Sequence, residues 1–164
     1  MQGTIVQVSV SLGGLPKRSV PGGRITPLGV EGDAHAHPRI HGGPDKAVLL
    51  IAAEVIDELI LRGYPVFYGA LGENLTTRGI SLRDLRIGDQ IRAGGALLEI
   101  TQPRGPCTAL DVYGQSLKGE IYDSAVKARN PASPHWGMSG FYARVLEAGP
   151  VGRDDIITRV ATLA

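Results

Sequence analysis

The chain contains one cysteine, Cys107, which ends the run Thr101-Gln102-Pro103-Arg104-Gly105-Pro106-Cys107. A lone thiol forms no internal disulfide, so it is either an inert buried side chain or a thiolate that acts in catalysis or binds a metal. Arg104 is a nearby cation that favours the ionised thiol, and Pro103 and Pro106 stiffen the loop. Functional residues often lie on such loops at strand ends. On this run alone both alternatives stay open.

Positively charged residues follow two glycine-rich turns. Lys17 and Arg18 come after Gly13-Gly14, and Lys46 ends the run His41-Gly42-Gly43-Pro44-Asp45-Lys46. Backbone N–H groups of such turns bind anions, and nearby Lys or Arg side chains bind phosphate. The alternative is that both segments are ordinary solvated turns. The sequence therefore offers these three cations as candidate anion ligands.

Histidines gather in a third glycine-rich segment, Gly29 to His37, which also contains Asp33 and His35; His41 follows shortly after. Neutral imidazoles are common zinc ligands. The spacing of these histidines matches none of the strong zinc signatures, so no dedicated zinc site is predicted.

Polar residues in three further runs are of interest. Asn74 has amide donors and an acceptor that can read the edge of a heterocycle, or it caps a turn. Arg129 is another candidate anion ligand, and downstream of it the only tryptophan, Trp136, either covers one end of the core or lines a pocket. Asp89, in an Ile-Gly-Asp run, is expected to accept hydrogen bonds from turn N–H groups.

The composition limits the class of protein. The chain has 164 residues, which fits a single domain over 1–164, and a formal net charge of +1, which gives no general electrostatic attraction to nucleic acid or an anionic membrane. No apolar run is long enough to span a bilayer, and a strand-like pattern begins at once, so no signal peptide is visible. A single cysteine fits a reducing compartment, and we expect a cytoplasmic protein. Ser-His-Asp elbow, Walker loop and dinucleotide-binding patterns are not found in the sequence.

The elements that must position these residues are mostly strands. Eight segments are strand candidates, of which we expect roughly seven to be strands: 4–10, 24–30, 47–51, 85–87, 89–93, 96–101, 140–147 and 155–162. Most show apolar alternation, whereas 47–51 is a continuous apolar run that predicts a buried strand, and Pro27 makes 24–30 an edge strand. Gly94-Gly95 predicts a hairpin turn, and helices are predicted at 53–62 and 116–129, with 68–79 as loop. The fold class is therefore mainly β: a closed or nearly closed antiparallel β-barrel with a few peripheral helices.

Five runs, in their order along the chain, resemble the MOSC domain, the family named after the C-terminal domain of molybdenum-cofactor sulfurase. They are the runs at 29–33, 41–48, 72–75, 87–89 and 103–107: Gly-x-x-Gly-Asp, His-Gly-Gly-Pro-Asp-Lys-Ala-Val, Gly-Glu-Asn-Leu, Ile-Gly-Asp and Pro-Arg-x-Pro-Cys. The resemblance extends from about Lys17 to Cys107 and again over 139–146, and is greatest to the standalone bacterial members.

This resemblance implies a β-barrel that uses the molybdenum cofactor, molybdopterin. In relatives that reduce N-hydroxylated compounds, including the mitochondrial amidoxime-reducing component, the matching cysteine ligates molybdenum, so Cys107 is the expected catalytic residue and metal ligand. The other candidate cofactor-binding residues are Lys17, Arg18, Asp33, His41, Gly42, Gly43, Lys46, Asn74, Arg104 and Arg129. The family often has arginine after Gly-Asp, where this chain has Ala34; Arg18 or Arg39 would have to replace that cation.

Three functions follow. The favoured one is a molybdenum enzyme that reduces a small N-hydroxylated substrate with electrons from a partner protein. The second is a sulfur carrier, in which Cys107 receives a persulfide from a cysteine desulfurase for metal–sulfur cofactor assembly. The third is a non-catalytic module that binds an anionic or pterin ligand.

Overall fold

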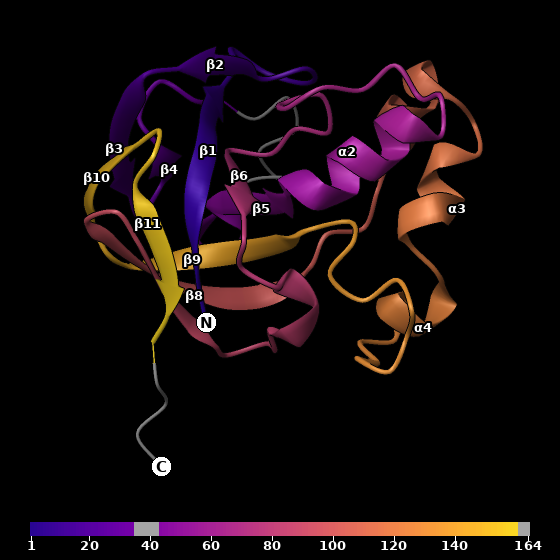
Figure 1. Cartoon of the computed structure of the whole chain (residues 1–164). Helices are drawn as coiled ribbons and strands as arrows, with labels where there is room; N and C mark the ends of the chain where they lie inside the picture. The colour runs from indigo at the N-terminus through magenta and orange to yellow at the C-terminus, as the bar shows by residue number, and fades with distance from the viewer. Residues whose placement is uncertain (35–42, 161–164) are drawn as a thin grey trace.

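The computed structural model describes residues 1–34 and 43–160, and its main feature is a closed barrel (Figure 1). Seven strands among these residues form the barrel in the order β11-β7-β8-β9-β5-β6-β1, and β1 pairs with β11 to close it. Their bounds are β1 (Gln2–Val10), β5 (Val48–Ala52), β6 (Leu75–Arg78), β7 (Gln90–Ala93), β8 (Ala96–Pro103), β9 (Phe141–Glu147) and β11 (Ile156–Arg159). The predicted barrel is thereby confirmed.

Smaller strands extend the barrel at one side. β2 (Arg18–Val20) pairs with the end of β1, and a separate sheet has the order β10-β3-β4. These three strands are β10 (Gly149–Gly152), β3 (Gly22–Thr26) and β4 (Gly29–Val30). The single edge strand predicted at 24–30 is thus a short hairpin, because Pro27 and Leu28 form an exposed turn between β3 and β4.

One pair of barrel strands is parallel, which corrects the expectation of a wholly antiparallel barrel. β5 and β6 run in parallel because α2 (Ala53–Leu61) carries the chain back between them. The segment 68–79 was predicted to be loop, yet its end forms β6, in which Leu75, Thr76 and Thr77 are all buried. Because two of its buried residues are threonines, β6 does not show the apolar alternation from which strands are predicted.

The barrel strands have apolar residues on two faces, and the helices lie together at one side of the barrel (Figure 1). In β5, Val48 and Leu50 pack inside the barrel, whereas Leu49 and Ile51 pack against the layer that contains α2, η3 (Thr108–Tyr113) and α3 (Leu117–Ile121). Both faces of β5 are therefore covered, as its continuous apolar run indicated. Trp136 is buried in the barrel core beside Phe141, as the core alternative states, and it also lines a cavity beside α2.

The hairpin of β7 and β8 positions the cysteine loop. Its turn at Gly94-Gly95 is confirmed, and β8 continues to Pro103, beyond the predicted end of that strand. Arg104 then donates its backbone N–H to the carbonyl of Gly140, at 2.9 Å. Gly140 has φ of 89°, and a Cβ there would overlap the carbonyl oxygen of Leu50. The loop that follows β8 is therefore fixed against β9 and β5.

The second predicted helix is broken in two. The segment 116–129 forms α3 and α4 (Ser124–Lys127), because Tyr122 is extended and the Asp123 side chain accepts from the backbone N–H of Val126 to begin α4. The short strand predicted at 85–87 is a turn after η2 (Leu82–Asp84), in which Asp89 accepts from the backbone N–H of Arg86 as expected. In the described part of the chain, the helices are too short or too polar to cross a bilayer.

Candidate functional site

A cavity of about 330 Å³ lies where the cysteine loop meets the barrel. Its walls come from the turn before β2, from η1 (Pro44–Lys46), from β5 and β9, from the loop before β6 and from the start of η3. The lining residues are Gly14, Leu15, Lys17, Ala34, Lys46, Leu49, Leu71, Gly72, Asn74, Arg104, Cys107, Thr108, Ala109 and Tyr142. Five residues predicted from sequence thus line one cavity, although four different loops or strands supply them.

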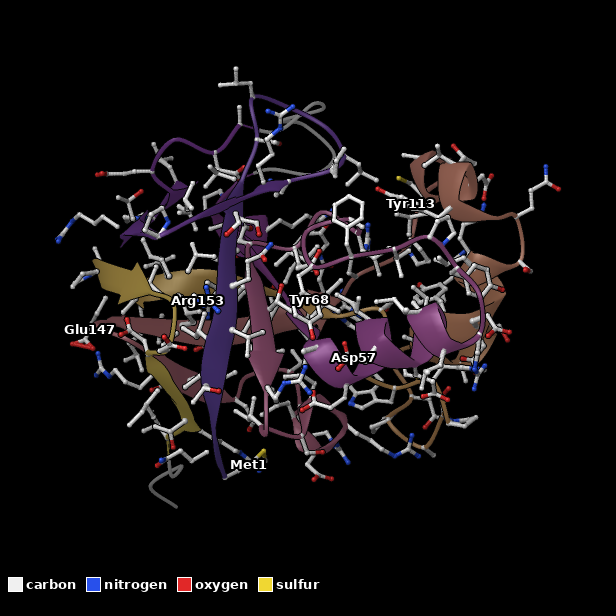
Figure 2. All side chains as sticks on the ribbon, turned by 45° about the horizontal axis from the view of Figure 1, so that its top comes forward. Met1, Asp57, Tyr68, Tyr113, Glu147 and Arg153 are labelled. Atoms are coloured by element: carbon white, nitrogen blue, oxygen red, sulfur yellow. The ribbon has the colours of Figure 1, made fainter. Side chains whose placement is uncertain are left out.

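Cys107 is partly exposed and lines this cavity directly before η3. Its carbonyl accepts the N–H of Leu110, at 3.1 Å, which fixes the backbone that carries the thiol. Figure 2 shows Tyr113, at the end of η3, on the same side of the barrel as α2. The thiol therefore lines the cavity and is not the fully buried side chain of the first alternative.

Arg104 is buried in the cavity wall, with 4% of its surface exposed. Its Nη2 donates to the carbonyl of Leu71 at 2.7 Å, but its buried Nη1 has no hydrogen-bond partner in residues 1–34 and 43–160. Burial lowers the pKa of Arg104, and the electrostatic interactions with Tyr142, Cys107 and Glu73 oppose that fall. An unpaired buried donor is costly, and the buried Oε1 of Glu73 also lacks a hydrogen-bond partner among the described residues, so this part of the wall is incompletely satisfied.

Glu73 lies behind this wall and is completely buried. Burial raises its pKa from 4.5 to about 7, although N–H groups of Glu73 and Gly69, the charge of Arg104 and the Thr76 hydroxyl all oppose the rise. The Thr76 hydroxyl is 3.3 Å from Oε2. The sequence showed Glu73 only as part of a short run, and nothing in that run indicates that it is buried beside Arg104.

Asp33, Lys17 and Asn74 form a polar cluster beside the cavity. Lys17 Nζ is 2.6 Å from both carboxylate oxygens of Asp33, and both side chains are over 90% buried. Asn74 Nδ2 donates to Asp33 at 2.8 Å and to the Ser9 carbonyl at 3.2 Å, and its Oδ1 accepts from Leu49 N–H at 3.0 Å. Both amide hydrogens of Asn74 are thus in use, so Asn74 fixes the wall and has no donor left to read a heterocycle.

The loop that carries Glu73 and Asn74 is tied to α2 and β1. Tyr68 donates its hydroxyl to Asp57 of α2 at 2.7 Å, and the two side chains lie next to each other in Figure 2. Arg78 donates to the same carboxylate at 2.8 Å, and Gln7 donates to the Tyr68 carbonyl at 2.7 Å. The loop is therefore positioned from both of its ends.

The remaining predicted residues are placed differently. Arg18 is exposed on β2 and does not line the cavity, and Gly43 is exposed before η1. Arg129 lines a second, neighbouring cavity, whereas Lys46 lines both. The predicted residues His41 and Gly42, like Arg39 and the histidines at 35 and 37, lie outside the described residues.

Ala34 lines the cavity at the position where the family resemblance implies arginine. The cations of the described wall are therefore Lys17, Lys46 and Arg104, and Arg18 does not take the place of the missing one. Residues 1–34 and 43–160 contain no group of three or more His, Cys, Asp or Glu side chains that could hold a metal ion.

Comparison with known proteins gives a family match. The model of the MOSC domain matches residues 37–158. YflK of Bacillus subtilis (strain 168) is 38% identical over 124 residues, which are 74% of this chain and 51% of YflK. YiiM of Escherichia coli (strain K12) is 33% identical over 148 residues, 84% of this chain and 60% of YiiM. The chain thus spans about half to three fifths of the length of these curated relatives.

Solved structures agree with the sequence comparison. The crystal structure of YiiM from Geobacillus stearothermophilus matches with a TM-score of 0.71 and 27% identity, over 97% of this chain and 75% of that one. YiiM from Escherichia coli matches with a TM-score of 0.68 and 28% identity, over 100% of this chain and 72% of that one. A protein of Gibberella moniliformis (strain M3125 / FGSC 7600) named as a reductase is 31% identical over 138 residues, 79% of this chain and 22% of that protein.

Proposed function

The chain belongs to the MOSC domain family, and on this premise we propose that its cavity holds a molybdopterin-type cofactor with Cys107 as the protein ligand to molybdenum. We propose further that the protein reduces small N-hydroxylated compounds. This reduction replaces the N–OH bond with N–H, consumes two electrons and two protons, and releases water. The cofactor, when bound, supplies the two-electron chemistry. The observation that carries the proposal is that Cys107 lines one cavity together with the cations Arg104, Lys17 and Lys46.

The residues of the cavity fit such a group. A thiolate is a soft ligand suited to a transition metal. Arg104, Lys17 and Lys46 line the cavity and would hold anionic groups such as a phosphate. The ion pair with Asp33 reduces the positive charge that Lys17 offers to a bound anion, and Ala34 adds no charge to the wall.

Tyr142 supplies a protonated hydroxyl to the same wall. Burial raises the pKa of Tyr142 above its usual value of 10, against the opposing charge of Arg104. The phenol therefore keeps its proton at neutral pH and can donate a hydrogen bond to a substrate in the cavity. The relative named as a reductase supports an oxidoreductase, and the electrons would come from a partner protein.

The test is cofactor retention. Wild type and Cys107→Ser are expressed in a bacterial host that makes molybdopterin, and molybdenum and pterin are measured on the purified proteins. We expect molybdenum in wild type and its loss in Cys107→Ser, while Thr108→Ser, a change at the neighbouring lining residue, retains it. Wild-type protein that carries neither molybdenum nor pterin from this host contradicts the proposal.

A second function, sulfur transfer, is favoured by the exposure of Cys107. The Cys107 thiolate would attack the outer sulfur of a cysteine desulfurase persulfide, form the new S–S bond and release the desulfurase thiolate. Mass spectrometry after incubation with a desulfurase and free cysteine should show one added sulfur atom on Cys107. An unmodified peptide, beside a carrier protein that is modified in the same mixture, rules this function out.

A further inference from the structure

A second cavity, of about 250 Å³, borders the first and shares two residues with it. Lys46 and Tyr142 line both cavities, and the Lys46 ammonium lies 5.5 Å from the centre of the Tyr142 ring. The other lining residues are Gln102, Pro103, Gly105, Tyr122, Val126, Lys127 and Arg129. In this described lining, three side chains are cationic and none is a carboxylate, so the cavity selects for negative charge.

Arg129 has an unusual backbone for a residue with a side chain. Its φ is 60°, and its N–H bonds to the Val126 carbonyl at 2.8 Å where α4 ends. Glycine is the usual residue at such a left-handed helix end, because other residues meet a steric cost there. The fold thus accepts a backbone cost at the residue whose guanidinium lines the cavity.

Two cations of this cavity, Lys127 and Arg129, have few contacts with the described protein. The Arg129 side chain makes one long contact, 3.5 Å from its Nη2 to Gln102 Oε1. Within the described part of the chain, neither Lys127 nor Arg129 forms a salt bridge with a carboxylate, whereas Lys17 in the first cavity does. A carboxylate could accept two parallel hydrogen bonds from the guanidinium of Arg129 and be attracted by the ammonium charge of Lys127.

We propose that this second cavity is a subsite for the carboxylate of the substrate, so that the protein prefers N-hydroxylated compounds that carry a negative charge. The volume is below the roughly 300–1,000 Å³ of pockets that enclose a whole drug-sized ligand, and therefore suits one end of a molecule. Because the two cavities share Lys46 and Tyr142, a molecule held in the second cavity would extend toward the cavity of Cys107. The identity of the reacting group rests on the proposed function, but binding of the carboxylate does not.

The first test needs no cofactor and uses benzoate, with benzamide as its neutral match, in calorimetric titrations of the whole protein. We expect benzoate to bind at least about tenfold more tightly than benzamide, and Arg129→Gly and Lys127→Met each to remove most of that difference. Glycine suits the φ of Arg129, so Arg129→Gly should melt at the wild-type temperature or above. Arg153→Gln, an exposed arginine outside both cavities, is the matched control.

The second test compares KM for benzamidoxime and 4-carboxybenzamidoxime in cofactor-loaded protein. A lower KM for the carboxylated compound in wild type, with the ratio of the two KM values near one in Arg129→Gly, supports the subsite. If no loaded protein reduces either compound but benzoate binds as expected, the proposed function fails and the subsite stands. Equal binding of benzoate and benzamide, or benzoate binding that both variants leave unchanged, overturns the subsite. Tighter binding of inorganic phosphate than of benzoate, lost in Arg129→Gly, overturns the carboxylate assignment.

Discussion

Replacement of Glu73 by glutamine removes a buried titratable group while it keeps the shape of the side chain. Burial raises the pKa of Glu73 from 4.5 to about 7. Between these values the folded protein keeps a proton that the unfolded chain has released, so stability falls as pH rises from about 4.5 to about 7 and is level above. Since one pKa unit corresponds to about 1.4 kcal/mol, the total fall attributable to Glu73 is about 3 kcal/mol.

The assay is urea unfolding from pH 4.5 to 8, followed by the fluorescence of Trp136, which is 2% exposed in the folded state. Other groups also titrate in this range, so the quantity that matters is the free energy of unfolding of Glu73→Gln minus that of wild type. We expect this difference to increase by about 3 kcal/mol between pH 4.5 and 7. Glu31→Gln, which alters an exposed glutamate, should give a difference that barely changes with pH.

A difference for Glu73→Gln that is constant across this range would show that the carboxyl ionises in the folded protein as readily as in the unfolded chain. The reasoning about its burial would then be wrong. A difference that falls with rising pH would reverse the sign and would require a lowered pKa, in which the charge of Arg104 outweighs burial.

Three further variants test the wall of the first cavity. Arg104→Met removes a charge that lowers the pKa of Glu73, so the fall in stability in the same pH series should extend to higher pH. If the pH dependence of stability is the same as in wild type, Arg104 does not influence the ionisation of Glu73. Asn74→Leu leaves buried hydrogen-bonding groups unpaired, so it should lower the free energy of unfolding, measured in urea, by about 2–4 kcal/mol. A decrease of less than about 1 kcal/mol would refute this expectation. Ala34→Arg adds a cation to the cavity wall and should tighten calorimetric binding of inorganic phosphate in a salt-sensitive way; unchanged affinity would show that the added charge does not reach the ligand.

The strands with apolar alternation were predictable from the sequence, and those built from small or polar residues were not. β1, β9 and the hairpin of β7 and β8 follow the period of two or have a glycine turn. β6 contains buried threonines, and β10 is Gly-Pro-Val-Gly, so neither shows that period. Their partners in the barrel and in the small sheet decide that they are strands.

The sequence allowed the candidate site residues to be identified, but it did not show which residues they contact in the folded protein. The run around Cys107 identified the thiol and Arg104, and both line the first cavity. The sequence does not show that Asp33 neutralises Lys17, since β2 and the β3–β4 hairpin lie between them in the chain. It also cannot show that Arg129 lies in a separate cavity, because only tertiary structure brings α4 beside Gln102.

Arg104 connects the two parts of the site, because two negative groups compete for its charge. Glu73 lies behind it, and an anion in the cavity that Arg104 lines would be attracted by the same charge. An anion bound there takes up part of the positive charge that now lowers the pKa of Glu73, so that pKa should rise and the folded protein should take up protons as the anion binds. In urea unfolding with sulfate present, an anion whose charge is constant in this range, the fall in wild-type stability should therefore move to higher pH, whereas Glu73→Gln should be stabilised without that movement. If sulfate binds and stabilises wild type equally at every pH from 5 to 8, Arg104 does not link the cavity to the buried carboxyl.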